Sequence, residues 1–310
     1  MSETRTTCPY CGVGCGVIAQ VDNNGVTVRG DPEHPANFGR LCVKGAALAE
    51  TTGLSGRLLQ PMVDGETASW SQVLDTAGER LRAIIAQHGP HAVAFYASGQ
   101  LLTEDYYAAN KLMKGFIGAA NIDTNSRLCM SSAVTGYKRA LGADVVPCSY
   151  EDIECSDLVV LVGSNAAWTH PVLYQRLVQA RNANPSMKVV VIDPRCTATC
   201  DIADLHLSLL PGSDAGLFVG LLNRIVAEGN AQSEFDDAAE TFAIARDWSL
   251  ARVAQFCGLD VADIVTFYDW FMRAPTAITL YTMGINQSAS GSDKCNAIIN
   301  VHLASGKFGR

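Results

Sequence analysis

The sequence has little that would tie the chain to a membrane or to nucleic acid. No stretch approaches the uninterrupted apolar length of a membrane span. Residues 1–7 contain neither the apolar core of a secretory signal nor a twin-arginine pair. The formal net charge is −8, and no stripe of lysine and arginine is present. We therefore expect neither a membrane nor a nucleic-acid partner.

The 310 residues also lack internal repeats and low-complexity segments. Their composition, 48% hydrophobic and 17% charged, is that of a globular protein with ample apolar material for a core. The length fits one large domain or two smaller ones. Eleven cysteines are an odd number, and they do not form the framework of a small secreted protein. This favours a reducing compartment, and we expect a cytoplasmic protein.

Four cysteines near the N-terminus form a regular pattern. Cys8, Cys11 and Cys15 are followed by Cys42, in the spacing C-x2-C-x3-C-x26-C. The close triplet offers three thiolates from one loop to a cuboidal cluster, and neighbouring glycines let the backbone wrap around it. Structural zinc sites usually pair two C-x2-C knuckles, whereas here the fourth cysteine stands alone. The pattern favours an iron–sulfur cluster, with zinc as the alternative.

The chain is predicted to form two regions. Residues 1–62 are expected to be a small β-rich domain, with strands at 17–21 and 25–29 joined by a tight turn. Such a unit is too small for its hydrophobic core alone to stabilise it, so a bound cluster would supply the additional stability. Residues 63–310 are expected to be α/β.

In the second region, apolar runs alternate with amphipathic segments. Strands are predicted at 92–97, 157–162, 188–192, 205–208 and 277–281. Helices are predicted at 71–85, 103–117, 128–141, 170–182, from 214 to 226, within 232–272, and at 293–305. This alternation predicts doubly wound parallel sheets with both faces covered.

Small and polar residues follow the predicted strands. The loops concerned are 98–100, 163–165, 193–195, 211–214 and 282–284. Each alone is explained equally well by the ordinary chemistry of turns and helix caps. We expect all five to lie at one edge of a sheet, where parallel sheets bind ligands, and together they favour a phosphate-bearing cofactor.

The cysteine pattern and several later motifs resemble one known family. The motifs are the four cysteines with Cys42-Val-Lys-Gly45, then the segments 124–133, 163–171, 192–195 and 282–287. In this order they are similar to the molybdopterin oxidoreductases, and most of all to the catalytic subunits of bacterial assimilatory nitrate reductases. The resemblance implies a [4Fe-4S] cluster on the four cysteines and a molybdenum held by two molybdopterin guanine dinucleotides. The family continues well beyond Arg310, so we expect an N-terminal portion, with the fold truncated at the C-terminus.

The resemblance also assigns roles to individual residues. Cys129 would bind molybdenum through its thiolate, although a lone cysteine is more often a small buried hydrophobe. Lys44 would link cluster and pterin, although most lysines lie at the surface. Arg127 would contact nitrate or a pterin phosphate. The implied dinucleotide and pterin contacts are Lys44, Gln100, Asn125, Gly163, Ser164, Asn165, His170, Asp193, Arg195, Gly212, Asp214, Met283 and Gln287.

The implied activity is the reduction of nitrate to nitrite, with electrons entering through the cluster. Formate dehydrogenase of the same superfamily is the rival, but it typically has a histidine after its metal-binding residue, where this chain has Met130. A non-catalytic iron–sulfur module is the other alternative, because the chain stops short of the family's length. The expected electron donor is a ferredoxin, a flavodoxin or an NADH-linked subunit. Among the remaining cysteines only Cys196 and Cys200 have ligand-like spacing, and they are expected to be structural.

Overall fold

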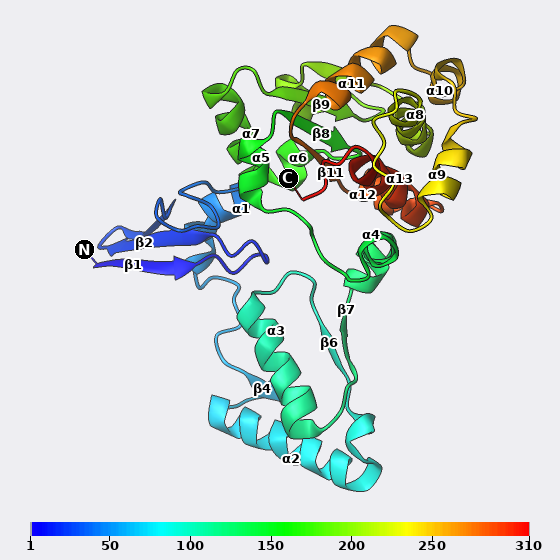
Figure 1. Cartoon of the computed structure of the whole chain (residues 1–310). Coiled ribbons are helices and arrows are strands. Elements are labelled where there is room, and N and C mark those ends of the chain that lie inside the picture. Colours follow the sequence, from blue (N-terminus) through cyan, green and yellow to red (C-terminus); the bar gives the residue numbers. More distant parts are fainter. Residues whose placement is uncertain (1, 310) are drawn as a thin grey trace. The chain divides into compact units, whose positions relative to one another are not determined.

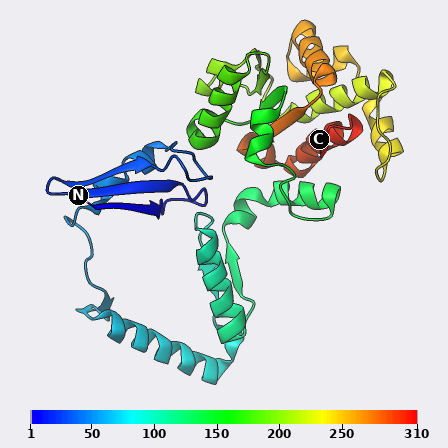
Figure 2. The ribbon, with the colours of Figure 1, turned by 60° about the vertical axis from the view of Figure 1, so that its left-hand side comes forward.

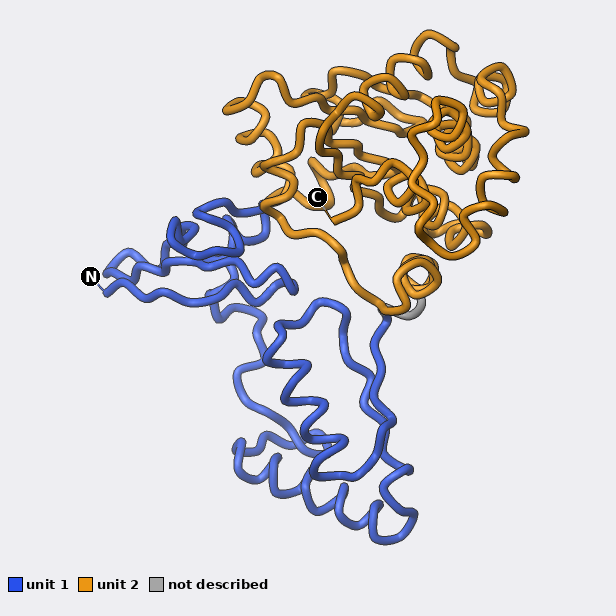
Figure 3. Tube along the Cα trace, viewed as in Figure 1, with its two compact units in different colours: residues 1–127 blue, residues 128–310 orange. Residues whose placement is uncertain are grey.

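The computed structural model describes residues 2–309, except for the side chains of residues 126–128. The chain divides into two compact units, residues 1–127 and residues 128–310 (Figure 3). The boundary lies near the start of helix α4 (Ser126–Leu141).

Unit 1 begins with an antiparallel sheet of strands β1 (Ser2–Thr7), β2 (Gly16–Asp22) and β3 (Gly25–Gly30), in that order (Figure 2). The predicted hairpin of β2 and β3 is confirmed. Strand β1 was not predicted, because all its side chains are exposed and it carries no hydrophobic alternation. It pairs with β2 along its whole length, from Ser2 opposite Val21 to Thr7 opposite Gly16.

The rest of unit 1 contains short elements around two longer helices. They are α1 (Val43–Ala46), a 3-10 turn (Leu48–Thr52), the hairpin β4 (Met62–Val63) and β5 (Glu66–Thr67), α2 (Trp70–His88), a 3-10 turn (Pro90–Ala92), β6 (Phe95–Ala97), α3 (Thr103–Asn110) and β7 (Ile122–Thr124). Helix α2 starts at a capping box in which Ser69 and Gln72 satisfy each other's backbone N–H groups. The predicted helices at 71–85 and 103–117 are confirmed, but α3 continues over Lys111–Ile117 with π-helical geometry.

Unit 2 is built on a parallel sheet whose described strands stand in the order β10-β9-β8-β11 (Figure 1). The strands are β8 (Leu158–Val162), β9 (Lys188–Ile192), β10 (Leu205–Leu207) and β11 (Ala277–Tyr281). The helices besides α4 are α5 (Tyr150–Cys155), α6 (Ala166–Thr169), α7 (Pro171–Ala183), a 3-10 turn (Ala198–Ile202), α8 (Asp214–Ala227), α9 (Ala238–Ala245), α10 (Leu250–Cys257), α11 (Val261–Arg273), α12 (Met283–Asn286) and α13 (Gly291–Ala304). The predicted strands and helices of this unit are present.

Strand β8 shows that both faces of this sheet are covered. Its residues are fully buried, and they alternate between two hydrophobic clusters. Leu158, Val160 and Val162 pack in the cluster that includes α8, α11 and α13. Val159 and Leu161 pack in the cluster on the opposite face, with α5, α6 and α7. Since successive strand residues point to opposite faces, this is the doubly wound arrangement that the sequence predicts.

The expectation that five strand-end loops share one edge is wrong for one of them. The loops after β8, β9, β10 and β11 lie at the carboxyl edge of the same sheet, because all four strands are parallel. Strand β6, which precedes the loop 98–100, pairs instead with β7 in a separate two-stranded sheet of unit 1. A run of about six apolar residues predicts a strand, but it does not show which strand will pair with it.

The order of the strands places a switch point next to β8. From β8 the chain proceeds to β9 and β10 on one side, and it returns later to add β11 on the other side. Connections leave in opposite directions at such a point, and open α/β sheets bind ligands in the crevice there. The loops concerned are residues 163–165 after β8 and 282–284 after β11. None of the described helices is long and apolar enough to cross a bilayer.

A partly buried histidine should make the stability of unit 2 depend on pH. The Nε2 of His302 pairs with the Thr279 hydroxyl at 2.8 Å, and the ring packs edge-on against Phe271. Burial, helped by the charge of Lys307, lowers the pKa of His302 to about 4. The unfolded chain therefore binds more protons between pH 4 and the ordinary histidine pKa of about 6.5, and stability falls as pH falls through that window.

Because of His302, we expect the free energy of unfolding of unit 2 to fall by about 2 kcal/mol when the pH is lowered from 7 to 5. Denaturant unfolding of the native chain and of His302→Gln at both pH values measures this. The variant should lose less stability on acidification. His88→Gln, at the exposed end of α2, is the matched control, and equal pH dependence in all three proteins would contradict the prediction.

Candidate functional site

The four N-terminal cysteines lie around the ends of β1 and β2. Cys8 directly follows β1 and Cys15 directly precedes β2, and both are buried, with 6% and 7% exposure. The Cys8 N–H donates to the Cys15 carbonyl at 2.8 Å, which closes the loop that carries Cys11. Cys42 is the N-cap residue of α1. A loop between two paired strands and a helix start thus present the four thiols.

Asn37 joins the loop of the triplet to the segment that leads to Cys42. Its side chain is fully buried. Its Oδ1 accepts from the Gly16 N–H at 2.8 Å, and its Nδ2 donates to the carbonyls of Gly16 and Arg40 at 3.1 and 2.8 Å. The sequence does not predict this role, because asparagine is common in loops and its partners are known only from the structure.

The four N-terminal thiols form the donor set of an iron–sulfur cluster. Around zinc, four ligand atoms lie about 2.0–2.3 Å from the metal and therefore about 3.5–4 Å apart. Among the described residues, only Cys196, Cys200 and His206 bring three ligand atoms within 4.8 Å of one another. No three of the four N-terminal thiols form such a group. Burial, together with the charges of Cys11, Cys8 and Cys42, raises the pKa of Cys15 to about 11. Four thiols presented by one loop and one helix start are ligands of the kind that hold an iron–sulfur cluster, and the residues fit it.

The cluster loop contacts a second predicted cofactor loop within unit 1. A Cβ on Gly12 would lie 3.2 Å from the Leu101 carbonyl oxygen, so the loop after β6 packs on the cysteine loop. Gln100 belongs to this loop, and Asn125 Oδ1 lies 2.5 Å from the place of a Cβ on Gly99. Gln100 and Asn125 therefore come together at the carboxyl ends of β6 and β7, with exposed side chains.

At the switch point of unit 2, two glycines bring the loops after β8 and β11 into backbone contact. The Gly284 N–H donates to the Gly163 carbonyl at 3.1 Å, and the Thr282 hydroxyl donates to the same oxygen at 2.8 Å. A Cβ on Gly163 would lie 2.8 Å from the Gly284 Cα, and Gly163 has a φ of +53°. Only glycine meets both demands without strain.

Cys129 lies beside this crossing, in the first turn of α4. Its Sγ is 3.8 Å from the Met283 Sδ and 3.5 Å from the Gln287 Nε2, which can donate to it. The Asn286 Nδ2 donates to the Cys129 carbonyl at 3.2 Å. A helix N-terminus favours a thiolate. The structure thus brings Cys129 together with Met283 and Gln287, which lie more than 150 residues further along the chain.

Asn286 is a second residue whose place at this site the sequence does not predict. It is buried, at 3% exposure, and its Oδ1 has no hydrogen-bond partner among the described residues. Its Nδ2 lies within 3.7 Å of the sulfur atoms of Met130 and Met283. A buried acceptor without a donor is costly, and such groups concentrate at sites that bind something.

The loop after β8 is held by the loop after β9. The Thr199 hydroxyl donates to Asn165 Oδ1 at 3.1 Å and accepts from the Ala167 N–H at 3.1 Å. Ser164 is buried, whereas His170 is exposed and its Nδ1 pairs with the Thr169 hydroxyl at 2.9 Å.

The loop after β9 carries Asp193 and Arg195. Asp193 is nearly buried, and its Oδ1 accepts from the Arg195 N–H at 2.9 Å. The side chain of Arg195 is exposed. These two residues lie on the same sheet edge as Gly163, and their predicted cofactor contacts stay predictions.

The remaining residues predicted to bind cofactors or nitrate differ in their exposure and in their partners. Gly212 is exposed, while Asp214 forms a buried ion pair with Lys294, Oδ2 to Nζ at 2.7 Å, so part of its carboxylate is already used. Lys44 is exposed in α1, two residues after Cys42. The side chain of Arg127 lies outside the described residues. Their roles in cofactor or nitrate binding stay predictions.

These features define a class of protein. It carries an N-terminal cluster domain, followed by an α/β region with glycine-rich loops and a cysteine thiol at the switch point of a parallel sheet. The chain belongs to the molybdopterin oxidoreductase family. The family's own domain matches residues 57–310, and the family's Fe4S4 domain matches residues 1–52. Its cofactors are a molybdopterin and a [4Fe-4S] cluster. The predicted domain boundary after residue 62 stays a prediction.

Known proteins of this family match the whole chain. A nitrate reductase of Klebsiella oxytoca is 77% identical over 100% of this chain and 36% of its own length. A nitrate reductase of Shewanella frigidimarina is 44% identical over 100% of this chain and 35% of its own length. The chain thus spans about a third of the length of these relatives. In fold it is similar to the acetylene hydratase of Pelobacter acetylenicus, with a TM-score of 0.77 over 98% of this chain and 44% of that one, at 23% identity.

We expect Asn37→Ala to lower cluster retention. The substitution leaves the buried Gly16 N–H without its acceptor, which costs about 1–3 kcal/mol, and frees the segment before Cys42. Iron per chain and the visible absorption of the cluster, measured after anaerobic purification, should both fall. Asn24→Ala, in the exposed turn between β2 and β3, is the matched control. Full iron content in Asn37→Ala would contradict the role assigned to Asn37.

Gly163→Ala should destabilise unit 2 more than backbone strain alone would. Gly229, with a φ of +73° and nothing within 4 Å of a Cβ, is the matched control for strain. A left-handed alanine costs about 1–2 kcal/mol at either position, and Gly163→Ala adds the clash with Gly284. Denaturant unfolding of both variants measures the difference. Equal losses would show that the backbone crossing tolerates a methyl group.

Proposed function

We propose that the protein is the molybdenum-dependent enzyme that reduces nitrate to nitrite, with electrons entering through the [4Fe-4S] cluster. The observation that carries the proposal is the Cys129 thiol, held 3.5 Å from Gln287 Nε2 and 3.8 Å from Met283 Sδ at the switch point. The nitrate reductase of Klebsiella oxytoca, 77% identical over the whole chain, supports the choice of substrate.

In this proposal the bound molybdenum supplies the two-electron chemistry that accepts an oxygen atom from nitrate. Overall, nitrate, two protons and two electrons give nitrite and water. Cys129 would hold the metal through its thiolate, and the Gln287 amide would donate to that sulfur. A donor on a ligand sulfur withdraws charge and so adjusts the reduction potential, by about 30 mV for each 1.4 kcal/mol in a two-electron couple.

The other residues would bind and orient the cofactors. We propose two molybdopterin guanine dinucleotides, with the loop 163–165 and Asp193 at the sheet edge contacting one of them. Backbone N–H groups of glycine-rich loops favour phosphate, and a carboxylate at a strand end favours a ribose or a base edge. Gln100 and Asn125 would contact a pterin, and Lys44 would lie between cluster and pterin.

We further propose an assimilatory role in the cytoplasm, with a ferredoxin, a flavodoxin or an NADH-linked subunit as the electron donor. The resemblance of the motifs supports this role. Deletion of the gene should abolish growth on nitrate as the sole nitrogen source while growth on ammonium persists. Growth of the deletion strain on nitrate would contradict the assimilatory role.

The substrate is tested with the protein expressed from its full open reading frame. We expect it to oxidise reduced viologen with nitrate and not to reduce dyes with formate. Cys129→Ser should lower the nitrate-dependent rate at least about 100-fold, because the metal loses a ligand, while iron content stays unchanged. Cys155→Ser, at an exposed thiol, is the matched control. Activity with formate alone would favour formate dehydrogenase. Iron without molybdenum or activity would favour an electron-transfer module.

A further inference from the structure

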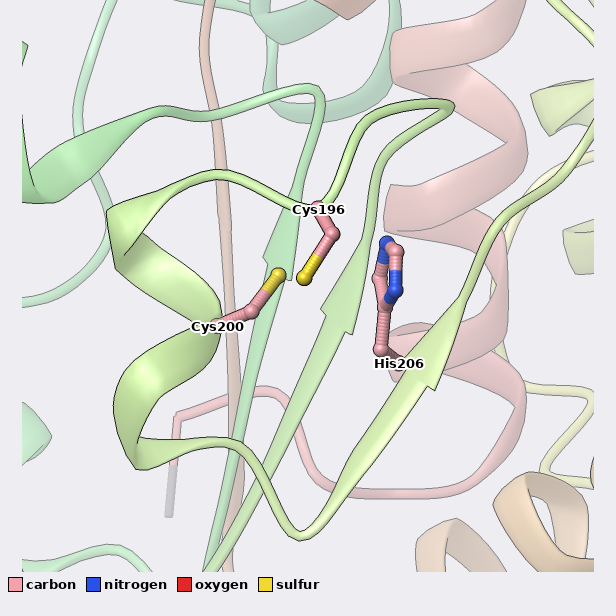
Figure 4. Close-up of side chains that lie close together, drawn as sticks. All are labelled: Cys196, Cys200 and His206. Carbon is pink, nitrogen blue, oxygen red and sulfur yellow. The ribbon is translucent and has the colours of Figure 1, made fainter.

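Three potential metal ligands outside the sites above lie together in unit 2. Cys196 and Cys200 flank the start of the 3-10 turn after β9, and His206 lies in the middle of β10 (Figure 4). The two sulfur atoms and a ring nitrogen of His206 all lie within 4.8 Å of one another. In Figure 4 the two thiols point toward each other, and the imidazole stands beside them on the neighbouring strand.

We propose that Cys196, Cys200 and His206 form a binding site for a thiophilic divalent cation, namely zinc. Two thiolates and an imidazole are a ligand set that zinc prefers. The spacing of Cys196 and Cys200, C-x3-C, lies within the C-x2–4-C range of zinc knuckles. Binding would draw the ligand atoms from within 4.8 Å to about 3.5–4 Å apart, a change that side-chain rotation can supply.

The backbone around the three ligands is well ordered by hydrogen bonds. The Cys200 N–H donates to the Thr197 carbonyl at 2.8 Å, and the Thr199 N–H donates to the Thr197 hydroxyl at 3.3 Å. His206 is paired with Val191 in the parallel register of β9 and β10. A turn and a strand thus hold the ligands, so little backbone entropy remains to be lost on binding.

The hydrogen bonding of His206 also suits a metal ligand. Its Nε2 lies 2.9 Å from the Asp193 carbonyl oxygen. A carbonyl oxygen only accepts, so Nε2 is the donor in this hydrogen bond and Nδ1 is the ring nitrogen left for a metal ion. Ligating histidines usually donate their other N–H to a carbonyl or carboxylate in this way.

Zinc here would fasten the loop of Asp193 and Arg195 to β10. Three protein ligands leave a fourth position, and Cys196 is exposed, so we expect water in that position and an ion that exchanges. Binding would release the two thiol protons and change no oxidation state. The proposal is independent of the nitrate reductase activity proposed above.

Zinc binding is tested on anaerobically purified protein with an intact cluster, because cluster-free cysteines would also bind zinc. We expect about one zinc per chain after treatment with a weak chelator, measured by elemental mass spectrometry. Cys196→Ser, Cys200→Ser and His206→Gln should each lower zinc retention at least about tenfold. His206→Gln keeps a donor for the Asp193 carbonyl, and circular dichroism checks that each variant folds. Cys155→Ser is the matched control and should retain zinc.

A second measurement needs no variant. Replacement of zinc by Co²⁺ in the native chain should give the charge-transfer absorption of thiolate-bound, tetrahedral cobalt. Three results would overturn the proposal: no zinc on fully reduced protein, equal zinc retention in all variants, or a Cys196–Cys200 disulfide without zinc in extracts quenched with an alkylating agent.

Discussion

The pairing of β11 with β8 is the constraint on which the site in unit 2 depends. The two strands are joined at their beginning by Thr276, whose hydroxyl and N–H both donate to the Asp157 carboxylate, at 2.7 and 3.1 Å. They are joined at their end by the contact between Gly163 and Gly284. This pairing closes a separation of 119 residues, so its loop-closure entropy must be offset by the buried strand residues on both faces of the sheet. It puts α12 next to α4 and thereby sets Met283 and Gln287 against Cys129.

Different interactions stabilise the two units. Unit 2 buries the alternating residues of β8 and β9 in two hydrophobic clusters. Among the described residues, the cluster domain of unit 1 shows no hydrophobic cluster of that size. It relies on strand pairing, on the buried amide of Asn37 and on the thiols themselves, so metal and fold are coupled there. Loss of the cluster should therefore affect the folding of this domain.

Sulfur dominates the chemistry at three separate places. Four thiols lie at the N-terminus, the Cys129 sulfur has the Gln287 amide beside it at 3.5 Å, and Cys196 and Cys200 lie close to a histidine. The same residue type serves each place differently, because spacing and neighbours decide how many metal ions the thiols can share. The exposed Cys155 belongs to no group of three potential ligands among the described residues, which makes it a suitable control for all three.

The sequence by itself determined the longer helices and the buried strands, the α/β class and the cluster motif, because hydrophobic periodicity and cysteine spacing are local. It missed β1, whose exposed residues show no such periodicity. It also pointed to the family, through Cys129 and the motifs that follow strands. The tertiary structure decided which strands pair, and so it assigned the loop of Gln100 and the loop of Gly163 to different sheets. It alone revealed the amides of Asn37 and Asn286 and the approach of His206 to two thiols. These are contacts between residues on different elements, and local pattern carries no information about such distances.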